Sequence, residues 1–488
     1  MGESNHHLVI RGASIVRPGS DDPEVGDIAI TDGVFSAVGG TVETPGEQEI
    51  DGSGLLAFPG VVDAHQHWGI YNPLEDDTVS ESRAAAQGGV TTGITYIRTG
   101  QYYLNRGGSY LDFMPEVLAR AEGRAHIDYG FHIAPMQSSH IDELEAIVDE
   151  FGVCSFKIFM FYGGHGLHGK SDDQATFLMT PPGERYDVGH FEFIMRGVAE
   201  LRRRRPELAD ALSVSLHCET AEIMRVYTEI VERDPSLAGL AAYSASRPPH
   251  SEGLAVAVAS YLAHVTGVTN INLLHLSSAV AIESAETMSE AYPDVDIRKE
   301  VTAGHLLTDI ESASGIGGKV NPPLRPREDV EALWAAIERG TVDWVVSDHA
   351  CCRAEDKFGS PSDNVWLAKS GFGGTEYLLP GLVTEASKRG VSMGRIAELT
   401  SKNPATRYGL NAKGDFSVGG DGDVALVDPN RSWVVRAEDS ESTQEYTPFE
   451  GYAMTASVTH TVLRGNVVFE GGSPVGEPNG RYVERPTR

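Results

Sequence analysis

Six residues of types that can hold divalent metal ions lie in or at the ends of short apolar runs in this 488-residue chain. They are His65, His67, Lys157, His217, His275 and Asp348. His65 and His67 close one such run, and because side chains alternate along a strand, both imidazoles face the same way. Zinc and similar ions favour neutral imidazole ligands. Any one of the six could be an ordinary buried polar group, whereas six at strand ends indicate a two-metal hydrolytic centre.

Lys157 is the most informative of the six, because the apolar residues Phe156, Ile158, Phe159 and Met160 surround it in the sequence. Burial disfavours a charged ammonium group, so a lysine in this setting should have a lowered pKa. A neutral amine can add carbon dioxide to give a carbamate, an anionic oxygen ligand long enough to bridge two metals. The alternative is a lysine that pairs with a carboxylate or extends to solvent.

Eight strand-like runs alternate with helix-like segments and position these six residues. The expected strands are 55–64, 93–97, 127–133, 155–160, 214–217, 270–275, 296–301 and 343–347. Helical periodicity appears between them at 143–151, 191–203, 252–265, 279–291 and 328–339. This alternation predicts an α/β fold, a (β/α)8 TIM barrel, whose active sites lie at the carboxyl ends of the strands.

The two ends of the chain have a different pattern, with short alternating runs and turn signals. Examples are 8–12 and 26–30 near the start, and 422–428 and 461–468 near the end. They predict one small β-sandwich domain built from residues 1–58 and 415–488, with the hydrolase barrel at 59–414.

Composition excludes several classes of protein. The chain has 39 basic and 70 acidic residues and a net charge of −31, which repels phosphate backbones and argues against nucleic-acid binding. Its four cysteines include no C-x-x-C pair, so neither a disulfide framework nor a thiolate zinc site is indicated. Without a signal-peptide pattern or a membrane-length apolar run, we expect a cytoplasmic protein that has no membrane association.

Ordered motifs give a resemblance that spans nearly the whole chain. They are Pro59-Gly60 before Asp63-Ala64-His65-Gln66-His67, Ser155-Phe156-Lys157-Ile158-Phe159-Met160, His275-Leu276-Ser277-Ser278, the run 300–307, Asn321-Pro322-Pro323-Leu324-Arg325-Pro326 and Ser347-Asp348-His349-Ala350. The chain resembles the amidohydrolase superfamily, and within it the cyclic amidohydrolases, which include dihydropyrimidinase, hydantoinase, allantoinase and dihydroorotase.

The resemblance implies two divalent ions, zinc first and manganese, cobalt or iron as alternatives, with Lys157 carboxylated by CO2. His65 and His67 would bind the more buried ion, and the Lys157 carbamate would bridge it to a more exposed ion. The ligands implied for the second ion are His217 and His275. Asp348 would complete the first site and act as the general base.

The implied reaction opens a cyclic amide or imide, such as a hydantoin or dihydropyrimidine ring, by attack of a hydroxide that bridges the two ions. Tyr162, five residues after Lys157, would stabilise the oxyanion and contact the substrate. The resemblance also implies a homo-oligomer, a tetramer or dimer.

Four further positions are predicted to bind the substrate, and at three of them, Trp68, Phe161 and Asn364, this chain departs from its relatives. Trp68 stands where dihydroorotases have an arginine, which disfavours dihydroorotate and suggests an apolar or aromatic wall, with packing in the core as an equal alternative. Phe161 replaces a usually small residue and would reshape the pocket. Asn321 and Asn364 are candidates for holding the ring, with Asn364 in place of an asparagine that reads the imide in dihydropyrimidinases.

Four other histidines receive lesser roles. Segment 163–190 is long enough for a lid, and His165 and His168 within it are expected at the surface. His305 and His349 match motif positions and are expected to support the ligands rather than bind metal.

Three other functions stay open beside the leading one. A related hydrolase would act on allantoin, a linear amide, an ester or a carbamate. A non-catalytic scaffold of dihydropyrimidinase type is disfavoured by the intact ligand positions. A one-metal deaminase is disfavoured by Lys157, because such deaminases lack this lysine.

Overall fold

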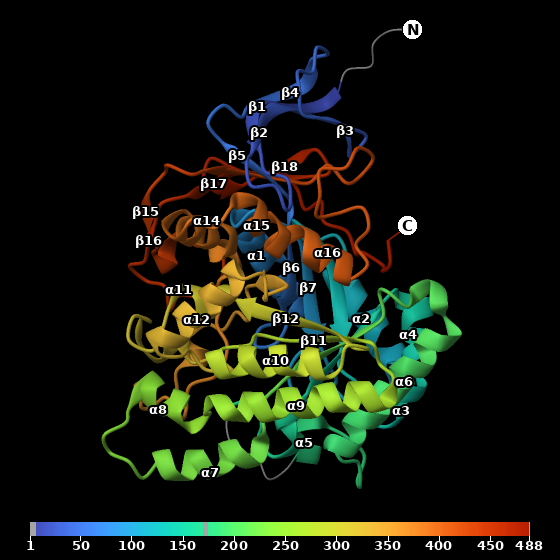
Figure 1. Ribbon diagram of the computed structural model, residues 1–488, viewed down its shortest axis with the longest axis vertical. Coiled ribbons are helices and arrows are strands. Elements are labelled where there is room, and N and C mark those ends of the chain that lie inside the picture. Colours follow the sequence, from blue (N-terminus) through green and yellow to red (C-terminus); the bar gives the residue numbers. More distant parts are fainter. Residues whose placement is uncertain (1–5, 169–173, 488) are drawn as a thin grey trace.

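The centre of the protein is a parallel sheet of eight strands that follow one another in chain order, β6 to β13 (Figure 1). The computed structural model describes residues 6–168 and 174–487. The strands are β6 (Val61–Gln66), β7 (Val90–Ile97), β8 (Asp128–Ile133), β9 (Ser155–Phe159), β10 (Ser213–His217), β11 (Asn270–Leu273), β12 (Asp296–Thr302) and β13 (Trp344–Val346). A parallel bridge between Gln66 and His349 connects the two edges. The predicted (β/α)8 barrel is therefore confirmed.

The first predicted strand differs from the structure, because the run 55–64 forms two strands. β5 (Leu56–Pro59) pairs with strands of a second sheet, and β6 begins the barrel after Gly60. A Cβ atom at Gly60 would come within 2.1 Å of the Thr91 hydroxyl and 2.7 Å of the Asp423 Cβ. The chain can pass from one sheet to the other only with glycine at this position.

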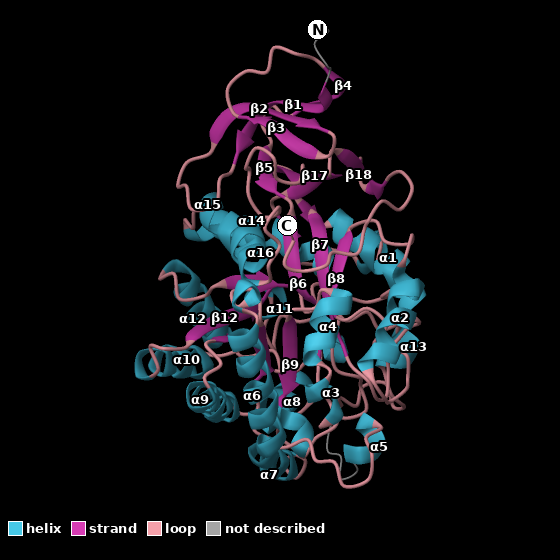
Figure 2. Cartoon of the chain, turned by 90° about the vertical axis from the view of Figure 1, so that its right-hand side faces the viewer, coloured by secondary structure: helices cyan, strands magenta, loops and turns pink. Residues whose placement is uncertain are grey.

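Helices follow most barrel strands and cover the outside of the sheet (Figures 1 and 2). They are α1 (Leu74–Gln87), α2 (Tyr110–Ala121), α3 (Ser139–Asp142), α4 (Leu144–Phe151), α5 (Gln174–Leu178), α6 (Val188–Arg204), α7 (Ala221–Val231), α8 (Gly239–Ser246), α9 (Pro249–Thr266), α10 (Ala279–Ala291), α11 (Ala303–Leu307), α12 (Arg327–Glu338), α13 (Ala354–Lys357), α14 (Leu378–Arg389), α15 (Met393–Ala397) and α16 (Asn403–Arg407). Local sequence sets several ends: the Ser278 hydroxyl caps α10, and Gly267 ends α9 in the left-handed conformation. In the described part of the chain, no helix combines the length and apolarity needed to cross a membrane.

Strands from both chain ends form a second, nine-stranded sheet at one end of the barrel (Figure 2). Its members are β5 together with β1 (His6–Ile15), β2 (Glu24–Thr31), β3 (Val34–Val38), β4 (Gly46–Asp51), β14 (Val424–Asp428), β17 (Ser457–Leu463), β18 (Asn466–Glu470) and β19 (Ser473–Pro474). A separate two-stranded sheet joins β15 (Trp433–Val434) and β16 (Ala453–Met454). The last residues return to the barrel, where the Val483 N–H donates to the Tyr129 carbonyl at 2.8 Å. The domain boundaries at 58/59 and 414/415 stay a prediction.

Candidate metal centre

The structure brings the six predicted ligands together at the carboxyl ends of the barrel strands. His65 lies near the end of β6, Lys157 in β9 and His217 at the end of β10, while His275 and Asp348 follow β11 and β13. Asp348 Oδ1 lies 3.2 Å from Nε2 of both His65 and His67. The ring centres of His217 and His275 are 4.3 Å apart. Because the carboxyl ends of the barrel strands lie at one end of the barrel, residues from five different strands come together in one small volume.

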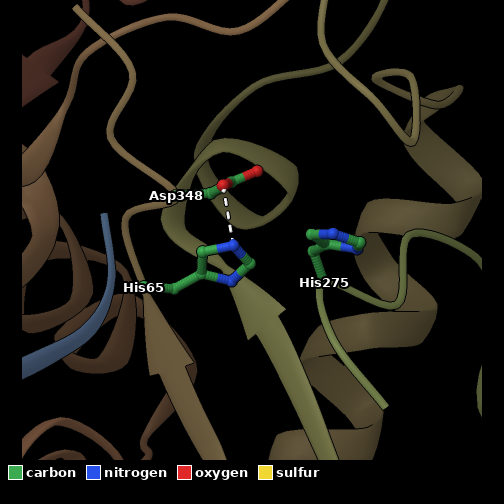
Figure 3. A group of neighbouring side chains, drawn as sticks. All are labelled: His65, His275 and Asp348. Carbon is green, nitrogen blue, oxygen red and sulfur yellow. Dashed lines mark ion pairs between the residues drawn. The ribbon is translucent and has the colours of Figure 1, made fainter. Parts of the chain in front are cut away.

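The donor set at this point fits a divalent ion. Ligand atoms of His65, His275 and Asp348 all lie within 4.8 Å of one another, and all three residues are buried (Figure 3). Burial lowers the pKa of His65, His67, His217 and His275, which favours the neutral imidazole that binds metal. Among the described residues, His275 Nδ1 has no hydrogen-bond partner although it is buried. A buried nitrogen of this kind is normally satisfied, and a metal ion would satisfy it.

Three of the four histidines have a partner on the ring nitrogen that faces away from this group. His65 Nδ1 lies 2.7 Å from Glu300 Oε1, and His67 Nδ1 lies 2.9 Å from the Tyr103 hydroxyl. His217 Nε2 lies 2.7 Å from Glu219 Oε2. Such partners fix the orientation and tautomer of a ligand, so the opposite nitrogen is left to bind metal.

Two of these partners belong to larger buried networks. Glu300 also accepts from the Trp344 indole at 2.9 Å and from the His275 backbone N–H at 3.1 Å, and burial raises its pKa. Glu219 accepts two hydrogen bonds from Arg247, which hold the pKa of Glu219 well below its usual range against the effect of burial. Glu300, Glu219 and Tyr103 were not among the residues predicted from the sequence to support the site. The role of Glu219 could have been predicted from the sequence, because this carboxylate stands only two residues after His217.

Lys157 is buried as predicted, at 1% exposure, and its Nζ lies 3.0 Å from His65 Nε2. Burial lowers its pKa to about 8, although Asp348 and Glu300 act in the opposite direction. The side chain packs against aromatic rings, with Nζ 4.2 Å from the centre of Tyr96 and 4.4 Å from that of Phe159. The neutral amine is therefore accessible near pH 8, as carbamate formation requires.

Two of the six predicted ligands have a backbone conformation that is unusual for residues with a side chain. His275 has a φ of 37° and Asp348 a φ of 55°, both in the left-handed region. Residues held in this region away from glycine are costly and occur mainly where the surrounding structure fixes them, often at active sites. Each stands two residues after the end of a barrel strand, where the turn points its side chain into the group.

A cavity adjoins the predicted ligands, and its lining includes three of the predicted substrate-binding residues: Phe161, Tyr162 and Asn321. The Phe161 ring lies 4.3 Å from the His217 ring, and Tyr162 stacks on Phe159 at 4.7 Å. The Asn321 side chain is already engaged, because it accepts from Tyr243 at 2.5 Å and donates to the Leu167 carbonyl at 2.8 Å.

The other two residues predicted to bind the substrate, Trp68 and Asn364, do not line this cavity. Trp68 is 1% exposed, packs near Tyr129 and is not among the cavity residues, so it belongs to the core. It follows His67 directly, and the alternation of side chains turns it away from the site. Asn364 is also absent from the cavity and accepts from the backbone N–H of Trp366 at 3.0 Å. Ser370 and Gly371 occupy the wall instead.

Two buried lysines hold this wall. Lys319 Nζ donates to the Ala368 carbonyl at 2.6 Å and to the His168 carbonyl at 3.1 Å. Lys357 Nζ donates to the Gly371 carbonyl at 2.6 Å and to the Lys319 carbonyl at 3.0 Å. Burial lowers the pKa of each lysine to about 7. These hydrogen bonds hold the backbone of segment 368–371 in place. Neither lysine was predicted from the sequence to have a role in the site.

The four lesser histidines are all buried or half-buried. His168 lies 2.8 Å from the Tyr102 hydroxyl and accepts from the Ser370 N–H at 3.0 Å, so it links its loop to the cavity wall rather than facing solvent. His165 is 3% exposed, which corrects its predicted surface position. His305 lies 2.7 Å from the Thr302 hydroxyl, and His349 lies 2.8 Å from Glu81. Of the predicted lid, residues 169–173 lie outside the described residues.

No protein-family model matches the chain. It is 34% identical to an allantoinase from Rubrobacter xylanophilus, over 99% of this chain and 98% of that protein. It is 30% identical to an allantoinase from Escherichia coli, over 98% of each. Among solved structures, the L-hydantoinase (dihydropyrimidinase) from Arthrobacter aurescens is 27% identical with a TM-score of 0.82, covering 98% of this chain and 100% of that one.

The barrel and its strand-end cluster define a metal-dependent hydrolase of the TIM-barrel class. The relatives that match over nearly the full length of the chain identify the family within this class. The chain belongs to the cyclic amidohydrolase family.

Proposed function

We propose that this protein is a metal-dependent hydrolase that opens the ring of allantoin, a cyclic ureide. The observation that carries the proposal is the 34% identity to an allantoinase over essentially the whole of both chains. The L-hydantoinase, at 27% identity, supports hydantoin or dihydropyrimidine rings as the second candidate substrate class. All of these rings contain an amide bond that hydrolysis opens without loss of a fragment.

The proposed cofactor is a pair of divalent ions, zinc first, held by His65, His67, His217, His275, Asp348 and carboxylated Lys157. The neutral Lys157 amine would use its lone pair to form a bond to the carbon of CO2 and release one proton, which leaves an anionic carbamate. Bound ions would supply Lewis-acid activation of water and of the amide carbonyl near neutral pH.

Two residues of the chain are proposed to handle protons and charge. Asp348, whose side chain is 11% exposed and faces the cavity, would take a proton from the attacking water and deliver it to the ring nitrogen that leaves. Tyr162 would donate its hydroxyl proton in a hydrogen bond to the carbonyl oxygen as negative charge develops there. Phe161 and Phe159 exclude water beside them, since both rings line the cavity.

A second cleft supports allantoin over an unsubstituted ring. It contains the side chains of Gln101 and Asn105, and it shares Ile70 and Tyr103 with the metal cavity, so the two spaces adjoin. Allantoin carries a ureido group on its hydantoin ring, and this group needs polar partners beyond those that the ring uses. Amide side chains in the adjoining cleft are suitable donors and acceptors for it.

The test compares allantoin, hydantoin and dihydrouracil as substrates of protein loaded separately with zinc and manganese. We expect the highest kcat/KM for allantoin, with allantoate as the product. A higher value for hydantoin or dihydrouracil would reject allantoin as the substrate but keep the ring-opening reaction. Bound metal without hydrolysis of any cyclic amide would reject the enzyme itself. Metal analysis of the same samples should give two ions per chain.

A homo-oligomer, a tetramer or dimer, is part of the same proposal because of the family resemblance. Light scattering of the purified protein during size-exclusion chromatography tests it. A monomer at all concentrations would contradict it.

A further inference from the structure

Arg98, directly after β7, is a buried cation that has no acidic partner among the described residues. It is 1% exposed, and among residues 6–168 and 174–487 no carboxylate lies within 4.0 Å of it. Nη1 donates to the Thr99 carbonyl at 3.1 Å, while Nη2 is buried and has no hydrogen-bond partner in the part of the chain that the structure describes. A buried charge is costly unless other groups stabilise it, so this arginine requires an explanation.

Aromatic rings surround the guanidinium group on the side that faces the metal cavity. Its central carbon lies 4.6 Å from the centre of the Phe177 ring, 5.3 Å from that of Tyr162 and 6.0 Å from that of Tyr103. Cation–π attraction offsets part of the cost of burial. Tyr162 and Tyr103 line the cavity, whereas Arg98 does not. Arg98 therefore stands behind the residues that a substrate would touch.

We propose that Arg98 is a positioning residue that acts through Tyr162, orienting its phenol and strengthening its hydroxyl as a hydrogen-bond donor to the substrate carbonyl. This inference rests on the proposed function, because it assumes that Tyr162 contacts the developing oxyanion. It assigns no direct contact between Arg98 and the substrate.

The electrostatics agree with this geometry. Burial raises the pKa of Tyr162, whereas the positive charge of Arg98 acts in the opposite direction. A nearby positive charge polarises the phenol O–H bond, and its effect is large where water is excluded. The same charge stabilises an oxygen that becomes negative on the far side of the hydroxyl. Through Tyr162, the charge of Arg98 can thereby act on a substrate in the cavity although Arg98 itself does not line it.

The competing explanation is that Arg98 only fills space behind the cavity. A purely structural residue would affect activity whether or not the Tyr162 hydroxyl is present. A residue that acts through the hydroxyl would lose its effect when that hydroxyl is removed. A double-mutant cycle between the two positions separates these cases.

The cycle consists of wild type, Arg98→Met, Tyr162→Phe and the double variant, all metal-loaded and assayed on the best cyclic substrate. We expect Arg98→Met to lower kcat by about 10- to 100-fold, less than the about 100- to 1000-fold of a lost oxyanion donor, with KM little changed. In the Tyr162→Phe background the same substitution should change kcat by less than about 3-fold. Arg98→Lys should keep most of the activity because it keeps the charge.

Arg407→Met is the matched control, since Arg407 is also a buried arginine but pairs with Asp296 at the amino end of β12. Its effect on kcat should combine additively with that of Tyr162→Phe. If Arg98→Met does not fold, Arg98→Gln takes its place in the cycle.

Two results would overturn the inference while leaving the proposed function intact: additive losses at Arg98 and Tyr162, or equal losses in Arg98→Lys and Arg98→Met. Full activity of Tyr162→Phe would instead reject the proposed role of Tyr162, and the inference with it. Coupled losses, with metal content and melting temperature unchanged, would support it.

Discussion

Tyr103 offers a sharp test of how the protein orients a metal ligand. Its hydroxyl lies 2.9 Å from His67 Nδ1, while the opposite nitrogen, Nε2, faces Asp348. With Nε2 reserved for metal, Nδ1 carries the proton and donates to the tyrosine oxygen. Tyr103→Phe removes that acceptor and keeps the ring in place.

The expected cost follows from the position of this hydrogen bond. A typical hydrogen bond contributes about 0.5–1.5 kcal/mol net, and a buried donor left without a partner costs about 1–3 kcal/mol. Because Tyr103 is half-buried, we take about 1–2 kcal/mol, which corresponds to about 5- to 30-fold weaker metal binding. Loss of a comparable ligand partner in metalloenzymes costs about 10- to 100-fold in metal affinity or activity, which overlaps the upper part of this range and extends above it.

The assay is competition for zinc between the protein and a chelator of known affinity, with ring hydrolysis measured at limiting and at saturating metal. We expect Tyr103→Phe to lose activity at limiting zinc and to regain most of it at saturation. Tyr102→Phe is the matched control, because its hydroxyl lies 2.8 Å from His168, which is not a predicted ligand. Equal zinc affinity in both variants would refute the proposed orientation of His67.

Three further outcomes are expected. Lys157→Ala should abolish hydrolysis, with partial recovery when short carboxylic acids are added; full activity without them would contradict the carbamate. Glu219→Gln should lower the free energy of unfolding in urea by about 3–5 kcal/mol, because Arg247 is left buried without its charged partner, and an unchanged unfolding midpoint would argue against the pair. In metal-free protein, burial lowers the pKa of His217 from 6.5 to about 4, so the unfolded chain binds more protons between these values. Thermal stability should therefore fall as pH drops from about 6.5 to 4; a flat profile over this range would contradict the assignment.

The fold could be predicted in most of its detail because its signals are local. Each expected barrel strand is a short apolar run, and Lys157 stands out because charged residues are rare inside such runs. The error at 55–64 is instructive, since a continuous apolar run carries no sign that Gly60 passes it from one sheet to another. That division depends on the approach of Thr91 and Asp423, which are distant in sequence from each other.

The sequence by itself determined the strand order, the residue types at the strand ends and the family, and with them the kind of chemistry. Tertiary structure alone decided which groups contact the site residues. Glu300 hydrogen-bonds His65 although 235 positions separate them in the sequence, and Arg98, which follows β7, lies over the ring of Tyr162. It also placed Ser370 rather than Asn364 at the cavity. The physical reason is that side-chain alternation fixes which face of its own strand a residue occupies. Side-chain alternation does not indicate which other loops and strands pack against that face, because these contacts join residues that are distant in the sequence.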